Sequence, residues 1–361
     1  MSTICVRKRH FGSIADGRPV DAWLLQVGGV RAEILTYGGI LHSLHVPDAA
    51  GRRDSVVLNL PTLEEYTHTS PYLGALVGRY ANRIAGGCFT LDGRVIRLPT
   101  NDRGHTLHGG PDGFDRRIWH AEPVRLPGRA AIRLNLHSPA GDMGFPGAVE
   151  VSCRYSLDAA ATLRLDYCAT TDAPTPVNLT NHAYFNLSGR SGGSVLGHIL
   201  TLDGDGYLPT TPDGIPYGPI TPVAGTPFDF RTPHPLGSRI RMNDPQLRAA
   251  GGYDHCWVLA PGPRGALRRA ARLADPGSGR LMEVWTTEPG LQVYTGNMLD
   301  GSLAGLDGKP YRRHSAICLE TQHYPDSPNR PEYPDTVLRP GVTHRSATEY
   351  RFPHLSGPPP A

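Results

Sequence analysis

The sequence predicts an all-β fold, with one large antiparallel domain and few, short helices. Apolar and polar residues alternate with a period of two in many short segments, which is typical of half-buried strands. The chain of 361 residues contains 43 glycines and 35 prolines, spread along its whole length as turn signals. No segment has convincing helical periodicity, and no repeat or linker divides the chain. We therefore expect a single domain over residues 1–354 and a loose tail over 355–361.

The expected strands follow one another from the N-terminus. Gly28-Gly29 and Gly38-Gly39 mark turns or bulges between strands in residues 20–47. Residues 88–99 predict a hairpin, because Asp92-Gly93 suits a tight turn. Further strands are expected as a meander over residues 130–171, and then within 198–209, 253–260, 266–275, 280–289, 291–297 and 315–322. Short helical turns are expected only at residues 63–66 and 244–250.

Composition narrows the class of partner. The net charge of +3 argues against nucleic acid. The six cysteines form no CxxC pair, the N-terminus has no apolar signal core, and no apolar stretch reaches membrane-spanning length. These features predict a cytoplasmic protein that does not contact a membrane, either a monomer or a homodimer.

The segment Ile317–Gly341 contains the most informative carboxylate. Glu320 interrupts an apolar, strand-like run, and the loop that follows is stiffened by Pro325, Pro328, Pro331, Pro334 and Pro340. A carboxylate at a strand end beside a rigid loop suits a positioned acid or base. A glutamate that merely caps the loop is the alternative.

His182 and His108 are the candidate histidines. His182 lies among asparagines, with Tyr184 two residues on, and such neighbours can orient an imidazole while aromatic rings stack on sugars. His108 adjoins two glycines, which permit a tight turn and close approach of a ligand. A structural role for each histidine remains open.

A metal site is the competing interpretation of these histidines. His105 lies three residues before His108, so a zinc site with His182, Asp254 or His255 has to be considered. The sequence has no HExxH motif and no Cys/His cluster, so we expect no metal and no other cofactor.

Four further polar residues suit a ligand rich in hydroxyl groups. An arginine fork and an amide at Arg83 and Asn82 can bind several lone pairs, and Asp254 and Gln292 lie at or within expected strands. A surface ion pair, a turn cap and an exposed strand residue are the alternatives. Phosphate-binding glycine motifs and the GxSxG elbow are absent from the sequence. The set favours acid–base chemistry on a neutral, hydroxyl-rich small molecule.

Six motifs carry a family resemblance. GRYANRIAGG, LHGGPDGFDRRIW, NLTNHAYFNLSG, YDHCWVL, QVYTGN and LETQHYPDSPNRPEYP occur in the order of the aldose 1-epimerases, the galactose mutarotases, which the chain resembles from Phe11 to Phe352. The resemblance implies an antiparallel β-sandwich of the galactose mutarotase type and an isomerase that needs no cofactor. It also implies Glu320 as general base, His182 as general acid and His108 as an aid at the ring oxygen. The sugar hydroxyls would be held by Asn82, Arg83, Tyr184, Asp254 and Gln292.

The implied reaction interconverts the α- and β-anomers of a free aldose of the galactose or glucose class. Glu320 would take the proton of the C1 hydroxyl, while His182 as imidazolium protonates the ring oxygen. We expect nearby negative charge to raise the pKa of His182. The chain departs from the family in residues 101–110, NDRGHTLHGG, and at Cys256, and both departures bear on sugar preference.

Two other functions stay open. One is a sugar-binding or regulatory module on the same fold, without catalysis. The other is a glycoside hydrolase that uses Asp254 and Glu320 as its two carboxylates. A hexose 6-phosphate substrate is less favoured than a free sugar, and the sequence does not choose among the free aldoses.

Overall fold

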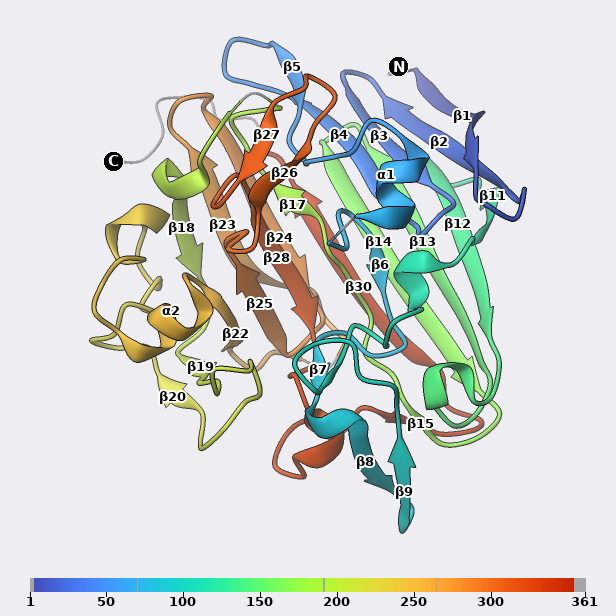
Figure 1. Cartoon of the computed structure of the whole chain (residues 1–361). Coiled ribbons are helices and arrows are strands. Elements are labelled where there is room, and N and C mark those ends of the chain that lie inside the picture. Colours follow the sequence, from blue (N-terminus) through green and yellow to red (C-terminus); the bar gives the residue numbers. More distant parts are fainter. Residues whose placement is uncertain (1–2, 70, 191, 264, 354–361) are drawn as a thin grey trace.

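Antiparallel strands dominate the computed structural model, which describes residues 3–69, 71–190, 192–263 and 265–353 (Figure 1). Three large sheets contain most of these strands, and all their pairings are antiparallel. The predicted all-β, antiparallel fold is therefore confirmed, and the predicted tail lies outside the described residues.

The largest sheet has nine strands and includes the predicted meander. Along β13 the apolar Val151 and Tyr155 are buried, whereas Glu150 is exposed, as the period-two pattern requires. The strand order is β11 (His120–Pro123), β12 (Arg129–Ser138), β13 (Val149–Asp158), β14 (Thr162–Thr171), β30 (His344–Arg351), β24 (Arg280–Thr286), β23 (Arg268–Asp275), β18 (Ile199–Leu202) and β21 (His234–Pro235).

A six-stranded sheet packs against the nine-stranded one and carries the candidate site. Its strand order is β17 (Tyr184–Phe185), β28 (Ile317–Gln322), β25 (Gly290–Tyr294), β22 (Asp254–Val258), β19 (Gly206–Leu208) and β20 (Thr221–Pro222). Ile317 and Leu319 of β28 share one apolar core with Leu165 of β14 and Val284 of β24. Because successive side chains alternate, Glu320 points to the opposite face of its strand, away from this core.

The N-terminal residues form a five-stranded sheet. Its order is β1 (Ile4–Ser13), β2 (Pro19–Val27), β3 (Val30–Leu35), β4 (Leu41–Pro47) and β5 (Arg53–Ser55). Val27 pairs with Val30, so Gly28-Gly29 is the predicted turn. The sequence did not predict β1, because most of its side chains are exposed and the apolar alternation is weak.

Short elements complete the fold. Asp92 and Gly93 both have positive φ (48° and 79°) between β8 (Cys88–Leu91) and β9 (Arg94–Arg97), which confirms the predicted hairpin.

Both predicted helical turns exist, as α1 (Leu63–His68) and α2 (Pro245–Ala250), and neither is long and apolar enough to cross a bilayer. The remaining strands are β6 (Leu76–Val77), β7 (Arg83–Ile84), β10 (Thr106–Leu107), β15 (Thr175–Pro176), β16 (Thr180–Asn181), β26 (Asp300–Ala304), β27 (Pro310–Arg312) and β29 (Val337–Leu338). Within the described residues, 3₁₀ turns lie at Ala85–Gly87, Phe114–Arg116, Asp142–Gly144, Val195–Gly197, Leu236–Ser238 and Ser327–Asn329.

Candidate active site

His182 lies next to Glu320, just before the short strand β17. Tyr184 of β17 pairs with Cys318 of β28, and the main chain of His182 bonds to Gly74 and Ala75. His182 Nε2 lies 3.6 Å from Glu320 Oε1, which is longer than a hydrogen bond. Both residues are almost fully buried, at 5% and 2% exposure. The two groups proposed to exchange protons with one substrate therefore face each other.

Cross-strand pairing also places Gln292 and Asp254 beside the glutamate. Gln292 of β25 pairs with Glu320 of β28, and its Nε2 donates a hydrogen bond of 2.7 Å to Asp254 Oδ1. Gln292 Oε1 and Glu320 Oε2 are shielded from solvent and have no hydrogen-bond donor among the described residues. Because an unpaired buried acceptor is costly, these two oxygens are well suited to receive the hydroxyl groups of a ligand.

The contacts of His108 fix its tautomer. Its ring lies 5.2 Å from that of His182, and the backbone N–H of Asn82 donates to its Nδ1 at 3.1 Å. Burial lowers the pKa of His108 well below its ordinary value, and the nearby His182 and Arg83 lower it further. A neutral ring that accepts at Nδ1 carries its proton on Nε2, so His108 is a hydrogen-bond donor.

The glycine after His108 makes a tight turn, as expected. A Cβ on Gly109, which has φ of 89°, would lie 2.2 Å from the carbonyl oxygen of Gly78. The absence of a side chain therefore lets the turn at His108 pack against the backbone that leads to Asn82. The close approach of a ligand to this backbone stays a prediction.

Burial sets the protonation states of the facing pair. It raises the pKa of Glu320 well above the ordinary value; Asp254 adds to the rise and Arg83 opposes it. Burial also lowers the pKa of His182 to about 4, against the opposing effects of its own backbone and of Asp254. The expectation that negative charge would raise the pKa of His182 is therefore wrong, because desolvation outweighs it. In the sugar-free site, burial therefore favours the uncharged form of both groups.

Three tyrosines surround the His182 imidazole. Tyr184 stacks on it at 5.1 Å and Tyr72 at 5.8 Å, while Tyr294 meets it edge-on at 6.4 Å. The hydroxyl of Tyr184 donates to the Pro71 carbonyl at 3.0 Å. Tyr184 thus orients the imidazole, and its contact with a sugar remains a prediction.

Asn178 ties together three segments of the site. Its Nδ2 donates to the carbonyls of Ala81 and His323 at 3.1 and 3.3 Å, and its Oδ1 accepts from the His323 N–H at 2.9 Å. Its main chain also bonds to Arg79 and Ala81. One buried amide therefore holds the segment before Asn82, the segment before His182 and the end of the Glu320 strand in fixed relation.

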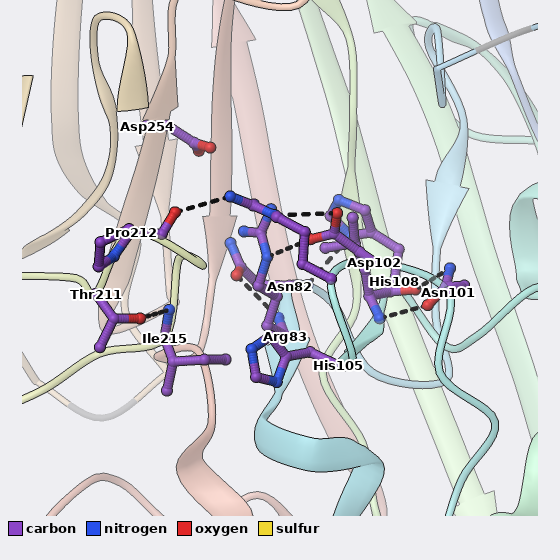
Figure 2. A network of polar contacts seen from close by, with 12 residues as sticks. Asn82, Arg83, Asn101, Asp102, His105, His108, Thr211, Pro212, Ile215 and Asp254 are labelled. Carbon is purple, nitrogen blue, oxygen red and sulfur yellow. Dashed lines mark hydrogen bonds and ion pairs between the residues drawn. The ribbon is translucent and has the colours of Figure 1, made fainter. Parts of the chain in front are cut away.

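The two arginines of the GRYANRI motif serve different purposes. Arg79 is 2% exposed, and its guanidinium donates to the carbonyls of Ser138, Pro139, Pro146 and Gly147. Arg83 instead donates from Nε to Asp102 Oδ2 at 2.8 Å, and its main-chain N–H bonds to Asn82 Oδ1 (Figure 2). Only the second arginine belongs to the candidate site.

A metal site involving His105 and His255 is not formed. His105 Nδ1 accepts from the Gly86 N–H at 2.9 Å, and His255 faces away, 4.8 Å from the Phe228 ring. Ligand atoms of His108, His182 and Glu320 do lie within 4.8 Å of one another. The tautomer of His108, however, presents an N–H there, which suits proton donation better than metal ligation.

The sequence analysis did not predict several residues that lie in the site. Tyr294 follows Gln292 at the same-face spacing of one strand, so its period could have revealed it. Tyr72 and Asp102 lie on loops far from their partners in sequence, and Tyr72 has φ of 65°, so no local pattern marks them.

Comparison with known proteins gives consistent matches. The family model described as aldose 1-epimerase matches residues 21–351. Pig galactose mutarotase is 40% identical over 350 residues, covering 97% of this chain and 99% of the relative. Escherichia coli aldose 1-epimerase is 38% identical over 340 residues, covering 93% and 96%. The crystal structure of galactose 1-epimerase from Lactobacillus acidophilus superposes with a TM-score of 0.85 at 26% identity, covering 97% of this chain and 99% of that one.

Proposed function

Because the chain belongs to the aldose 1-epimerase family, and is thus an isomerase that interconverts the anomers of aldoses, we propose that Glu320 and His182 transfer the protons of this reaction. The supporting observation is the facing pair itself, a buried carboxyl group and a buried imidazole 3.6 Å apart, whose pKa values burial shifts toward the uncharged forms. Ring opening and ring closure each need one donor and one acceptor, so a pair that holds one proton suits both halves of the reaction.

Ring opening uses the charged form of the pair. The Glu320 carboxylate takes the proton of the C1 hydroxyl, and the electrons of the O1–H bond form the second bond of the C1=O1 carbonyl. The C1–O5 bond breaks, and its electrons leave with O5. His182 gives its Nε2 proton to the departing O5. Hydrogen bonds from sugar hydroxyls to Glu320 Oε2 favour the carboxylate and thereby move the shared proton to His182 as the sugar binds.

Ring closure uses the neutral form that opening leaves behind. After rotation about C1–C2 has exposed the other face of the aldehyde, O5 attacks C1. Neutral His182 takes the O5 proton, and Glu320 returns a proton to O1. The cycle restores the starting state of both groups, so no cofactor enters the balance.

The surrounding residues orient the sugar in this proposal. The Nε2–H of His108 donates to the ring oxygen or a neighbouring hydroxyl, because the Asn82 backbone keeps its proton on that nitrogen. Asn82, Arg83, Asp254 and Gln292 bind the remaining hydroxyls. The relatives named for galactose make a free aldose of the galactose or glucose class the proposed substrate.

Polarimetry on freshly dissolved α-D-galactose and α-D-glucose tests the function directly. The protein should speed the decay of rotation for at least one of them. Sugar binding by calorimetry without any acceleration would instead identify a non-catalytic module, and release of reducing sugar from a glycoside would identify a hydrolase that uses Asp254 and Glu320.

A further inference from the structure

The segment before His108 supplies a counter-ion to Arg83. Asp102 Oδ2 accepts from Arg83 Nε at 2.8 Å and lies 3.3 Å from Arg103 Nη2 (Figure 2). Arg103 in turn donates from Nη1 to the carbonyl of Pro212 at 2.8 Å. Burial alone would raise the pKa of Asp102, but the two guanidiniums outweigh burial and lower it, so Asp102 is ionised.

Packing against the backbone at Gly214 and the ion pair with Asp102 together fix the position of the Arg83 guanidinium. The Arg83 side chain is 9% exposed, and a Cβ on Gly214 would lie 2.9 Å from its Cζ and Nη1. The backbone at Gly214 thus lies against the guanidinium on one side, while Asp102 binds its Nε. Arg83 therefore cannot swing outward to meet a charged ligand.

The charges near the reacting groups leave no excess of positive charge. Arg83 contributes one positive charge, which Asp102 balances, and the carboxyl groups of Asp254 and Glu320 lie on the adjoining strands β22 and β28. Arg103 lies further out, with 46% of its side chain exposed and two contacts already made. Among the described residues around this site, an anion would meet the carboxylates of Asp102 and Asp254 and no unpaired arginine or lysine.

We propose that Asp102 is a specificity-determining residue, which cancels the charge of Arg83 and thereby excludes anionic sugars such as uronic acids and sugar phosphates. This inference rests on the proposed function, because it concerns which aldoses that reaction accepts. It gives the segment Asn101–Gly104, which precedes the motif at His108, a role in substrate choice.

Asp102→Asn tests the inference, because asparagine keeps an oxygen that accepts from Arg83 but carries no charge. Asp166→Asn is the matched control. Asp166 has a similar side-chain exposure (21% against 24%) and also pairs with two arginines, Arg154 and Arg164, but it belongs to β14 of the nine-stranded sheet. D-Galactose and D-galacturonate are the probes, since they differ at C6 by a charged group.

The ratio of kcat/KM for galacturonate to that for galactose should rise about tenfold in Asp102→Asn, equivalent to roughly 1.4 kcal/mol, and stay at the wild-type value in Asp166→Asn. The rise should shrink at high ionic strength, because salt screens the freed charge of Arg83. An unchanged ratio in Asp102→Asn, or an equal rise in both variants, would overturn the inference. The proposed function would still stand in that case, provided that the protein accelerates the mutarotation of galactose. If the wild type turns over neither sugar, calorimetry can measure the affinities for galacturonate and for galactose instead. A rise in the ratio of these affinities in Asp102→Asn alone would then support the role of Asp102, and an unchanged ratio would overturn it.

Discussion

His182 and Glu320 face each other at 3.6 Å, yet burial shifts both toward their uncharged forms. In water this pair would exist as an ion pair near pH 5 to 6, between unperturbed pKa values of roughly 4.3 and 6.5. Inside the protein burial disfavours this ion pair, and we propose that hydrogen bonds from sugar hydroxyls to the Glu320 carboxylate lower the free energy of moving the proton to His182. A reversible isomerase needs both the charged and the neutral form of the pair to be accessible, because ring closure starts from the form in which ring opening ends.

Glu320→Gln and His182→Asn should each lower kcat by about 10²–10⁴-fold, because each removes one proton-transfer partner. Polarimetry with galactose gives the rate, and thermal unfolding checks that the fold survives. The double variant should be little slower than either single one, since the two groups act as a unit. Losses that multiply in the double variant would contradict their joint action.

The pH profile of kcat/KM should show a plateau that extends down to about pH 4, where a second proton binds to His182. On the alkaline side the rate should fall only above the raised pKa of Glu320, where the pair loses its single proton. Rates measured from pH 3.5 to 10 check this. A narrow optimum confined between roughly 4.3 and 6.5, the unperturbed pKa values, would show that burial does not shift the pair.

Asn178→Asp should lower kcat by about 10²-fold, because the loss of its two N–H donors frees the segments that position Glu320 and Asn82. Asn186→Asp is the control, since Asn186 is similarly buried and also donates to two carbonyls and accepts from one N–H. Both variants should lose similar thermal stability, whereas kcat in Asn186→Asp should stay within about threefold of wild type. Equal losses of kcat would show that Asn178 only stabilises the fold.

Stability should fall as the pH drops from about 6.5 toward 4. Burial lowers the pKa of His42 and His198 to about 4 and that of His255 to about 3. Between those values and the unfolded value of roughly 6.5, the unfolded chain binds more protons, so stability rises with pH. Urea unfolding at several pH values measures the slope. His255→Leu should reduce this slope, and the same change at the exposed His120 should not.

Most of the fold, and the position of Glu320, could be predicted because they lie in regular strands. Period-two alternation marks β13 and β28; it indicates that Gln292 points to a different face from its neighbours, and Glu320 stands out as a carboxylate where the pattern expects a buried residue. The weak amphipathic pattern of β1 hid that strand.

Contacts between distant loops could not be predicted in the same way. Nothing local to residue 102 indicates that its carboxylate meets Arg83, and nothing local to Tyr72 indicates the imidazole it covers. The direction of the pKa shift of His182 was misjudged for a related reason. Sequence neighbours show which charges are near, whereas the depth of burial depends on all the packed elements together.

The pairing of Tyr184 with Cys318 has a consequence for redesign of this protein. The direction in which Glu320, the proposed base, points follows from strand register, and a slip of one residue would turn it toward the apolar core. The Asp102 and Gly214 segments lie on connections outside the six-stranded sheet. A mutant library confined to these two connections would therefore sample new sugar preferences on an unaltered catalytic framework.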